Sequence, residues 1–225
     1  MKTTFYTKVG KRMLDLAGSG LGLLILSPVF FIVAALVKAS SAGPVFFRQV
    51  RVGQFQKTFR IFKFRSMRLN SAGSKGGLLT AAGDPRVTPV GRFLRNTKLD
   101  ELPQLINVVI GEMSLVGPRP EVPEYVAAYS EEQLRVFEQR PGITGPAAIS
   151  HVREEELLAA QTDKHGFYLR VLMPSKLAID LDYCANITLF GDLKNLFATF
   201  TSIFRKPAST RESIAPPAAK AELAD

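Results

Sequence analysis

The chain has 225 residues, of which 46% are hydrophobic, and a formal net charge of +9. This length allows one globular domain with additions, and the composition excludes a protein with many membrane spans. The single cysteine, Cys184, excludes an intramolecular disulfide framework and a Cys-X-X-Cys metal site.

The positive charge is concentrated in one part of the chain. Between Asp15 and Asp84 there is no acidic residue, and the remaining 20 basic and 20 acidic residues of the chain balance. The basic residues of this interval are Lys38, Arg48, Arg51, Lys57, Arg60, Lys63, Arg65, Arg68 and Lys75. Such a segment suits anionic lipid head groups, nucleic acid or a phosphorylated substrate.

An uncharged apolar run covers residues 16–37. As a straight helix it would measure about 33 Å against a hydrocarbon core of roughly 30 Å, so the default expectation is a single-pass helix. Ser27 and Pro28 lie near its centre, and a proline there breaks or kinks a helix. Each half would cross about half a bilayer. The Ser27 hydroxyl can bond a carbonyl that the proline frees.

Basic residues flank the apolar run on both sides, and these are Lys8, Lys11, Arg12, Lys38 and Arg48. Basic flanks favour the cytoplasm, whereas a straight span would place one flank outside. A re-entrant helix-break-helix, which enters the membrane and returns, keeps both flanks inside. The residues themselves leave this arrangement and a kinked single span open.

The rest of the chain predicts an α+β, mostly helical domain. Alternating bulky and basic residues over 45–67, interrupted at Gly53, predict a small β-hairpin. Residues 70–83 are glycine- and serine-rich and predict a loop, and two short helices follow over 85–113. Solvated helices are expected over 131–140 and 153–164, with a turn-rich connection at PGITGP between them.

The last predicted helix carries an apolar stripe. Its residues recur at helical spacing, and they are Leu193, Leu196, Phe197, Phe200, Ile203 and Phe204. The stripe indicates either a core-facing helix or an amphipathic interfacial helix that lies on the membrane. The tail over 207–225 is rich in proline and alanine, which predicts disorder.

Asp100 and Glu101 are the main candidates for chemistry. Pro103 fits a helix only in its first turn, so the helix that carries PQLINVVIG begins close to Asp100. Both carboxylates then lie at the positive end of a helix dipole, beside free N–H groups that also bind phosphate. Two carboxylates without a histidine or cysteine cluster suit Mg²⁺.

Cations surround this pair in the sequence, and they are Arg92, Arg95, Lys98, Arg119 and Arg140. Arginine binds phosphate oxygens through a planar fork of N–H groups. Carboxylates, Mg²⁺ and several arginines together indicate phosphoryl transfer, in which a carboxylate can also serve as the nucleophile.

Four motifs together resemble those of the bacterial sugar transferases, the small monotopic phosphoglycosyl transferases. They are KRMLDL followed by SP, FRIFKFRSM, GRFLRNTKLDELPQLINVVIGEMSLVGPRP and RPGITG, and the resemblance covers roughly residues 8–204. It implies transfer of a sugar-1-phosphate from a UDP-sugar to undecaprenyl phosphate, with release of UMP. This reaction starts the assembly of a glycan, such as an exopolysaccharide, O-antigen or glycoprotein glycan, at the cytoplasmic face of the bacterial inner membrane.

The resemblance also implies roles for single residues. Asp100 would attack the β-phosphate and hold the phospho-sugar covalently, and Glu101 would bind Mg²⁺. Asp180 would have a less defined part in substrate binding. The residues that would contact phosphates or the uridine nucleotide are Lys63, Arg95, Arg119 and Arg140.

Ser27 and Pro28 match the break in the family's re-entrant membrane helix. Because a UDP-sugar is cytoplasmic, the resemblance favours the re-entrant arrangement over a span. The expected organisation is a membrane segment at 1–40, a cytoplasmic catalytic domain with interfacial helices at 41–206 and a tail at 207–225. The chain also resembles the minimal form of the family, without a polytopic N-terminal domain.

The sequence departs from the family pattern at Ile106, at Glu112 and at Pro146-Ala147-Ala148, where Trp-Ala-Gln is common. These departures bear on sugar preference. The implied partners are a UDP-sugar, undecaprenyl phosphate and inner-membrane lipids, without nucleic acid, and a homo-oligomer is left open. One alternative is a non-enzymatic membrane adaptor whose basic stretch binds anionic lipid or nucleic acid. Another is a direct single displacement with Asp100 as general base.

Overall fold

The computed structural model describes residues 4–68, 84–152 and 154–204. Within them the chain is mostly helical, as the sequence predicted, with the predicted hairpin and a second small sheet that the sequence did not predict. The predictions for the 70–83 loop and the 207–225 tail lie outside the described residues. The helices are α1 (Lys11–Ser40), α2 (Pro89–Asn96), α3 (Gln104–Ile110), α4 (Pro123–Val126), α5 (Glu131–Leu134), α6 (Pro146–Ser150), α7 (Glu154–Ala159), α8 (Lys164–Phe167), α9 (Met173–Ala185) and α10 (Leu189–Phe204). The strands are β1 (Phe46–Val52), β2 (Thr58–Phe64), β3 (Ser114–Val116) and β4 (Gly142–Thr144).

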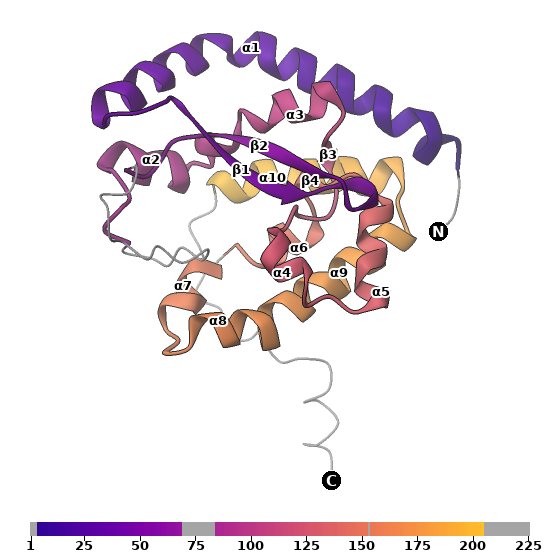
Figure 1. Cartoon of the computed structure of the whole chain (residues 1–225). Helices are drawn as coiled ribbons and strands as arrows, with labels where there is room; N and C mark the ends of the chain where they lie inside the picture. The colour runs from indigo at the N-terminus through magenta and orange to yellow at the C-terminus, as the bar shows by residue number, and fades with distance from the viewer. Residues whose placement is uncertain (1–3, 69–83, 153, 205–225) are drawn as a thin grey trace.

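The long helix α1 arches over one side of the molecule, with α3 and the β1–β2 hairpin beneath it (Figure 1). Among the described residues, the segment Tyr6–Ser40 is long and apolar enough to cross a membrane. The predicted break at Ser27 and Pro28 is wrong, because α1 stays helical through both residues. Pro28 has no N–H to donate to the Leu24 carbonyl, and the Ser27 hydroxyl donates to that oxygen instead, at 2.8 Å.

Both halves of α1 contact the rest of the protein. Near its beginning, Arg12 donates to the carbonyls of Val108 and Val109 at 2.6 and 2.9 Å, and so caps the C-terminal end of α3. Near its end, apolar side chains of α1 pack in a core with residues from β2 and α2. That core contains Val33, Val37, Phe64 and Leu94. The two ends of α1 therefore contact the same folded body.

Asp15 fixes the N-terminal half of α1 to β3. Its Oδ1 accepts hydrogen bonds from the Ser114 hydroxyl at 2.9 Å and from the Leu115 amide at 2.8 Å. Asp15 is almost fully buried, so these bonds compensate part of the cost of removing the carboxylate from water.

The predicted β-hairpin is confirmed. Strands β1 and β2 are antiparallel, with Phe46 opposite Phe64 and Val52 opposite Thr58. Alternate residues of a strand point to the same face of the sheet, so Phe59, Ile61 and Lys63 of β2 lie on one face. Phe59 and Ile61 are buried against Val108 and Met113 at the end of α3. The hairpin thus packs against the helix that follows Asp100 and Glu101.

The sequence predicted a turn-rich connection at PGITGP. The structure instead contains strand β4 in this segment. This strand pairs in parallel with β3, which places the GPRP and RPGITG motifs side by side. The Gly117 amide donates to Thr144 O at 2.9 Å, and the Gly142 amide donates to Pro118 O at 2.8 Å. A side chain on Gly142 would lie 2.1 Å from the Gly117 nitrogen, so the contact requires glycine.

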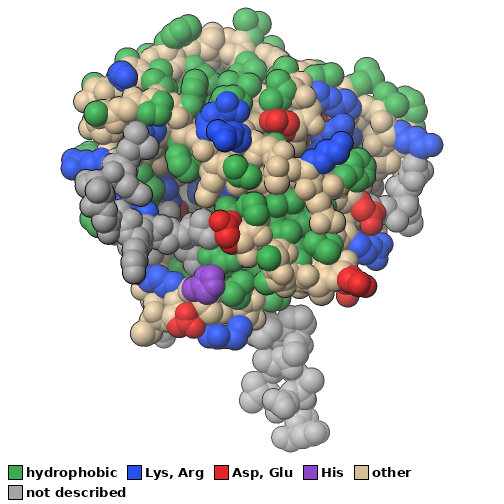
Figure 2. All heavy atoms as spheres, in the orientation of Figure 1, with side chains coloured by type: hydrophobic (Ala, Val, Ile, Leu, Met, Phe, Trp, Pro, Cys, Tyr) green, Lys and Arg blue, Asp and Glu red, His purple; other side chains and the backbone are tan. Residues whose placement is uncertain are grey.

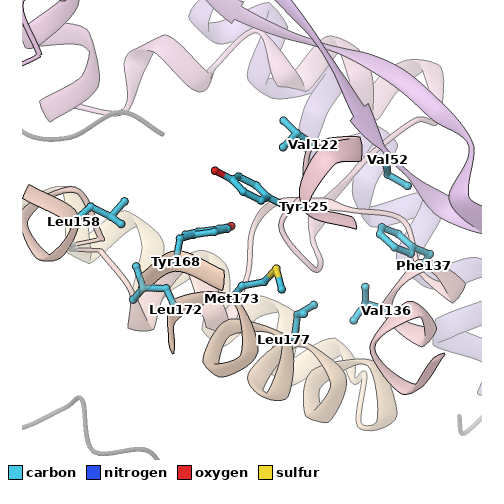
Figure 3. Close-up of a cluster of buried hydrophobic side chains, with 10 residues drawn as sticks. All are labelled: Val52, Val122, Tyr125, Val136, Phe137, Leu158, Tyr168, Leu172, Met173 and Leu177. Carbon is cyan, nitrogen blue, oxygen red and sulfur yellow. The ribbon is translucent and has the colours of Figure 1, made fainter. Parts of the chain in front are cut away.

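A buried hydrophobic cluster supports the side of the molecule opposite α1 (Figure 3). Helix α8, the π-helical segment Tyr168–Leu172 and helix α9 follow one another without interruption and line this cluster. Its members are Val52, Val122, Tyr125, Val136, Phe137, Leu158, Tyr168, Leu172, Met173 and Leu177. Because Val52 ends β1, the hairpin and α9 share this core.

Two surfaces expose large hydrophobic side chains. Figure 2 shows hydrophobic spheres along the edge that α1 forms in Figure 1. The exposed side chains of α1 include Leu21, Leu24, Ile25, Phe31 and Ile32, and those of α10 are Leu189, Phe190, Leu193, Phe197 and Phe200. The opposite side of α10 carries the fully buried Asp192. Leu193, Phe197 and Phe200 of the predicted apolar stripe thus face outward, whereas Leu196 packs against a buried cluster. The three exposed side chains favour the interfacial interpretation over a core-facing helix.

Candidate active site

Glu101 lies between two cations that come from distant parts of the chain. Lys63 on β2 places its Nζ 2.7 Å from Glu101 Oε1, and Arg119 in the GPRP segment places Nη2 3.2 Å from the same oxygen. Burial alone would raise the pKa of Glu101, but the charges of Lys63 and Arg119 hold that pKa well below its usual range. Glu101 is therefore a fixed carboxylate anion.

Asp100 is adjacent in sequence but has a different environment. It is 6% exposed, and its Oδ1 makes no hydrogen bond to any residue that the structure describes. Burial raises the pKa of Asp100 to about 6, although the charge of Lys63 acts in the opposite direction. At neutral pH this side chain is mostly an ionised carboxylate with a bare oxygen, which is the state that a nucleophile needs.

The local sequence explains how the pair is presented. Lys98 adopts a left-handed conformation with φ of 58°, which turns the chain after α2. A 3-10 turn over Leu99–Glu101 follows, and Pro103 then caps α3. Asp100 and Glu101 therefore lie in the first turn of this helical segment, close to where the sequence placed them.

Arg119 and Asp180 meet through the backbone. Asp180 lies on α9, is 4% exposed, and its Oδ2 accepts from the Arg119 amide at 3.4 Å. Burial raises the pKa of Asp180 to about 7. Asp180 thus binds the backbone of the GPRP segment, while the Arg119 side chain pairs with Glu101.

The two other predicted arginines lie in different places. Arg95, in the last turn of α2, forms an ion pair with Glu155 of α7, and its charge also lowers the pKa of Asp100 against the larger effect of burial. Arg140 donates through Nε to Gly111 O at 3.0 Å, at the opposite end of α3 from Asp100. The structure brings Asp100, Glu101, Lys63 and Arg119 together, but it does not bring Arg140 to this group.

The profile of the family described as "Bacterial sugar transferase" matches residues 6–206. The chain belongs to the bacterial sugar transferase family. Curated relatives of this sugar transferase include an undecaprenyl-phosphate glucose phosphotransferase of Komagataeibacter xylinus, 40% identical over 84% of this chain and 35% of the relative. A UDP-glucose:undecaprenyl-phosphate glucose-1-phosphate transferase of Klebsiella pneumoniae is 39% identical over 89% of this chain and 41% of the relative.

A third relative of the sugar transferase is the exopolysaccharide production protein PSS of Rhizobium leguminosarum bv. phaseoli. It is 37% identical over 85% of this chain and 94% of the relative. The chain therefore spans about two fifths of the length of the first two relatives, and almost all of the third.

Sequence reasoning about this sugar transferase missed two residues of the site. Arg51 and Gln104 line a small pocket together with Lys63 and Arg119, beside Glu101. Arg51 appeared in the sequence only as one of many basic residues. The hairpin register was the missing signal, because it pairs Arg51 with Phe59 and so puts it on the same face as Lys63.

The predicted Mg²⁺ has a partial set of ligands in the sugar transferase. No group of three or more His, Cys, Asp or Glu residues among the described residues could hold a metal ion. Asp100 and Glu101 nevertheless offer carboxylate oxygens, of which Asp100 Oδ1 makes no hydrogen bond to the described residues. Mg²⁺ is usually bound by one or two carboxylates plus water and substrate phosphates. The pair fits a Mg²⁺ held jointly with a phosphorylated substrate, and this stays a prediction.

Proposed function

We propose that this chain transfers a sugar-1-phosphate from a UDP-sugar to undecaprenyl phosphate and releases UMP. The observation that carries the proposal is the buried Asp100, whose bare carboxylate oxygen lies beside the Lys63–Glu101–Arg119 group. The printed names of the relatives, which include transferases of glucose-1-phosphate to undecaprenyl phosphate, support the same reaction. The match to an enzyme family gives no support to the alternative of a non-enzymatic adaptor.

The proposed reaction has two balanced steps. The Asp100 carboxylate attacks the β-phosphorus, the bond from that phosphorus to the bridging oxygen breaks, and UMP leaves with the electron pair. A phosphate oxygen of undecaprenyl phosphate then attacks the same phosphorus, and the Asp100 carboxylate is released. Lys63 and Arg119 offset the charge of the phosphates, which is the main task of a protein in phosphoryl transfer. A bound Mg²⁺ on Glu101 would further neutralise the charge of the diphosphate.

The first test is UMP release from a panel of UDP-sugars with and without undecaprenyl phosphate. We expect turnover with at least one UDP-sugar only when the lipid is present. No turnover with any sugar would contradict the proposal. The panel also identifies the sugar that the reaction transfers.

The ionisation of Asp100 predicts a pH dependence of the first step. Burial raises the pKa of Asp100 to about 6, and only the ionised carboxylate can attack. The single-turnover rate of UMP release without lipid should therefore be constant above pH 7 and fall about tenfold per pH unit below pH 6. Both phosphates of a UDP-sugar are diesters and do not titrate in this range. A rate that stays constant down to pH 5 would contradict the assignment.

We also propose that α1 lies in one leaflet of the bacterial inner membrane and that both of its flanks are cytoplasmic. Support comes from the exposed apolar side chains of α1 and from the contacts of its two ends with one body. Cysteines introduced by Lys8→Cys and Arg48→Cys, each with Cys184→Ser, should resist a membrane-impermeant thiol reagent in intact cells and react after lysis. Labelling of the Lys8→Cys protein in intact cells would restore the single-pass arrangement.

A further inference from the structure

Three of the six residues that line the small pocket beside Glu101 are cationic. Its lining residues are Arg51, Ile61, Lys63, Gln104, Arg119 and Pro120. The carboxylates that contact these cations are Glu101, which Lys63 and Arg119 share, and Glu121, which pairs with Arg51 at 3.3 Å. The lining itself thus contains three cations and no carboxylate, so the pocket suits an anion.

Arg51, which lines this pocket, has an unused donor. Its Nη1 donates to Pro120 O at 3.0 Å, and its Nη2 donates to Gln49 Oε1 at 2.8 Å. Its Nε is buried and makes no hydrogen bond with any described part of the chain. A buried N–H without an acceptor is costly, and a guanidinium group bonds phosphate oxygens well.

The charges around Arg51 also favour a bound anion. Burial lowers the pKa of Arg51, and the nearby charge of Arg119 acts in the same sense, although Glu121 opposes both. Two arginines that are close enough to repel each other are stabilised by a shared anion. Arg51 lines the same pocket as Lys63 and Arg119, which both pair with Glu101.

We propose that Arg51 is a direct phosphate ligand, which completes with Lys63 and Arg119 a pocket for a phosphate monoester. The inference rests on the proposed function, in which two such groups come next to Asp100. One is the phosphate of the departing UMP, and the other is the head group of undecaprenyl phosphate. Both have the same chemistry, a terminal phosphate with two negative charges.

The test compares Arg51→Gln with Arg60→Gln in the full-length protein in detergent. Arg60 lies on the neighbouring strand and is exposed, so its replacement removes the same charge away from the pocket. Equilibrium binding of UMP and the KM for undecaprenyl phosphate are measured for both variants. Arg51→Gln should weaken one of them by about ten- to a hundredfold, the loss expected for one charge-assisted hydrogen bond, and Arg60→Gln should change neither. Loss of UMP binding assigns the pocket to the leaving nucleotide, and a raised KM for the lipid assigns it to the acceptor.

A second variant distinguishes phosphate binding by Arg51 from a purely structural role of this residue. If Arg51 acted only by holding the GPRP segment, through Pro120 O and Glu121, then Arg51→Gln would weaken the binding of UMP and of phosphate-free uridine alike, and Glu121→Gln would cause a similar loss. If Arg51 binds phosphate, Glu121→Gln removes a competing carboxylate and leaves the affinity unchanged or higher. Equal losses in the two variants, or no loss in Arg51→Gln, would overturn the inference. If Arg51→Gln does not fold, the comparison of Glu121→Gln with the Arg51→Gln/Glu121→Gln double variant decides in the same way. A wild-type protein that binds neither ligand would instead overturn the proposed function.

Discussion

Asp100→Asn is expected to reduce UMP release from a UDP-sugar by at least about a thousandfold, because the amide cannot form the covalent bond to phosphorus. The substitution keeps the shape of a side chain that is almost completely buried, so the fold should persist. In the wild-type protein, incubation with UDP-sugar in the absence of lipid should add the mass of one phospho-sugar. Peptide mapping should place this mass on Asp100, and the variant should lack it.

The matched control is Asp182→Asn, which changes an exposed aspartate of α9 and should leave both readouts intact. Turnover in Asp100→Asn at the wild-type rate would contradict the role of Asp100. Loss of activity in Asp100→Asn without any trapped adduct in the wild-type protein would instead favour the direct displacement, in which Asp100 is a general base.

Lys11→Met is expected to lower the free energy of unfolding by about 3–5 kcal/mol. Lys11 Nζ lies 2.5 Å from Asp192 Oδ2, and Asp192 is fully buried. The same carboxylate accepts from the hydroxyls of Tyr6 and Tyr183 at 2.6 and 2.7 Å. Removing the lysine leaves the carboxylate buried and without its cation, which costs more than the lost contact itself. The shift can be measured as a lower midpoint of thermal unfolding in detergent.

Two further variants check the cause of this loss. Lys8→Met removes an exposed lysine three residues earlier and should shift the midpoint little. Lys11→Met combined with Asp192→Asn should recover part of the lost stability, because no buried charge then remains unpaired. A Lys11→Met protein as stable as the Lys8→Met protein would show that the ion pair of Lys11 and Asp192 makes no net contribution to stability.

Local patterns explain which parts of the fold were predictable. The β1–β2 hairpin followed from alternation within a few residues, and the place of Asp100 and Glu101 followed from Pro103. The parallel pairing of β3 and β4 joins residues far apart in the chain, and the short GIT strand has no periodicity of its own. At Pro28, a breaker was visible, but the Ser27 bond that replaces the missing amide keeps the helix intact.

The arginines show which part of the candidate site the sequence could not predict. Their number and their nearness to Asp100 in the sequence indicated phosphate binding, but these features do not determine direction in space. Arg140 belongs to the RPGITG motif, yet its side chain donates to Gly111 O at the far end of α3. Arg51 is distant from Asp100 in the sequence, but its place on β1 of the hairpin puts it in the lining of the pocket. Only the pairing of strands and the packing of the hairpin on α3 separate the two.

The contacts of α1 also bear on how the enzyme can be handled. Arg12 supplies donors for the last carbonyls of α3, Asp15 fixes β3, and Val33 and Val37 fill a core with Phe64 and Leu94. Helix α1 is therefore an integral part of the folded domain and not a removable tether. A truncation that begins after Ser40 would open that core and release the helix that follows Asp100 and Glu101. Production of folded protein thus depends on keeping α1.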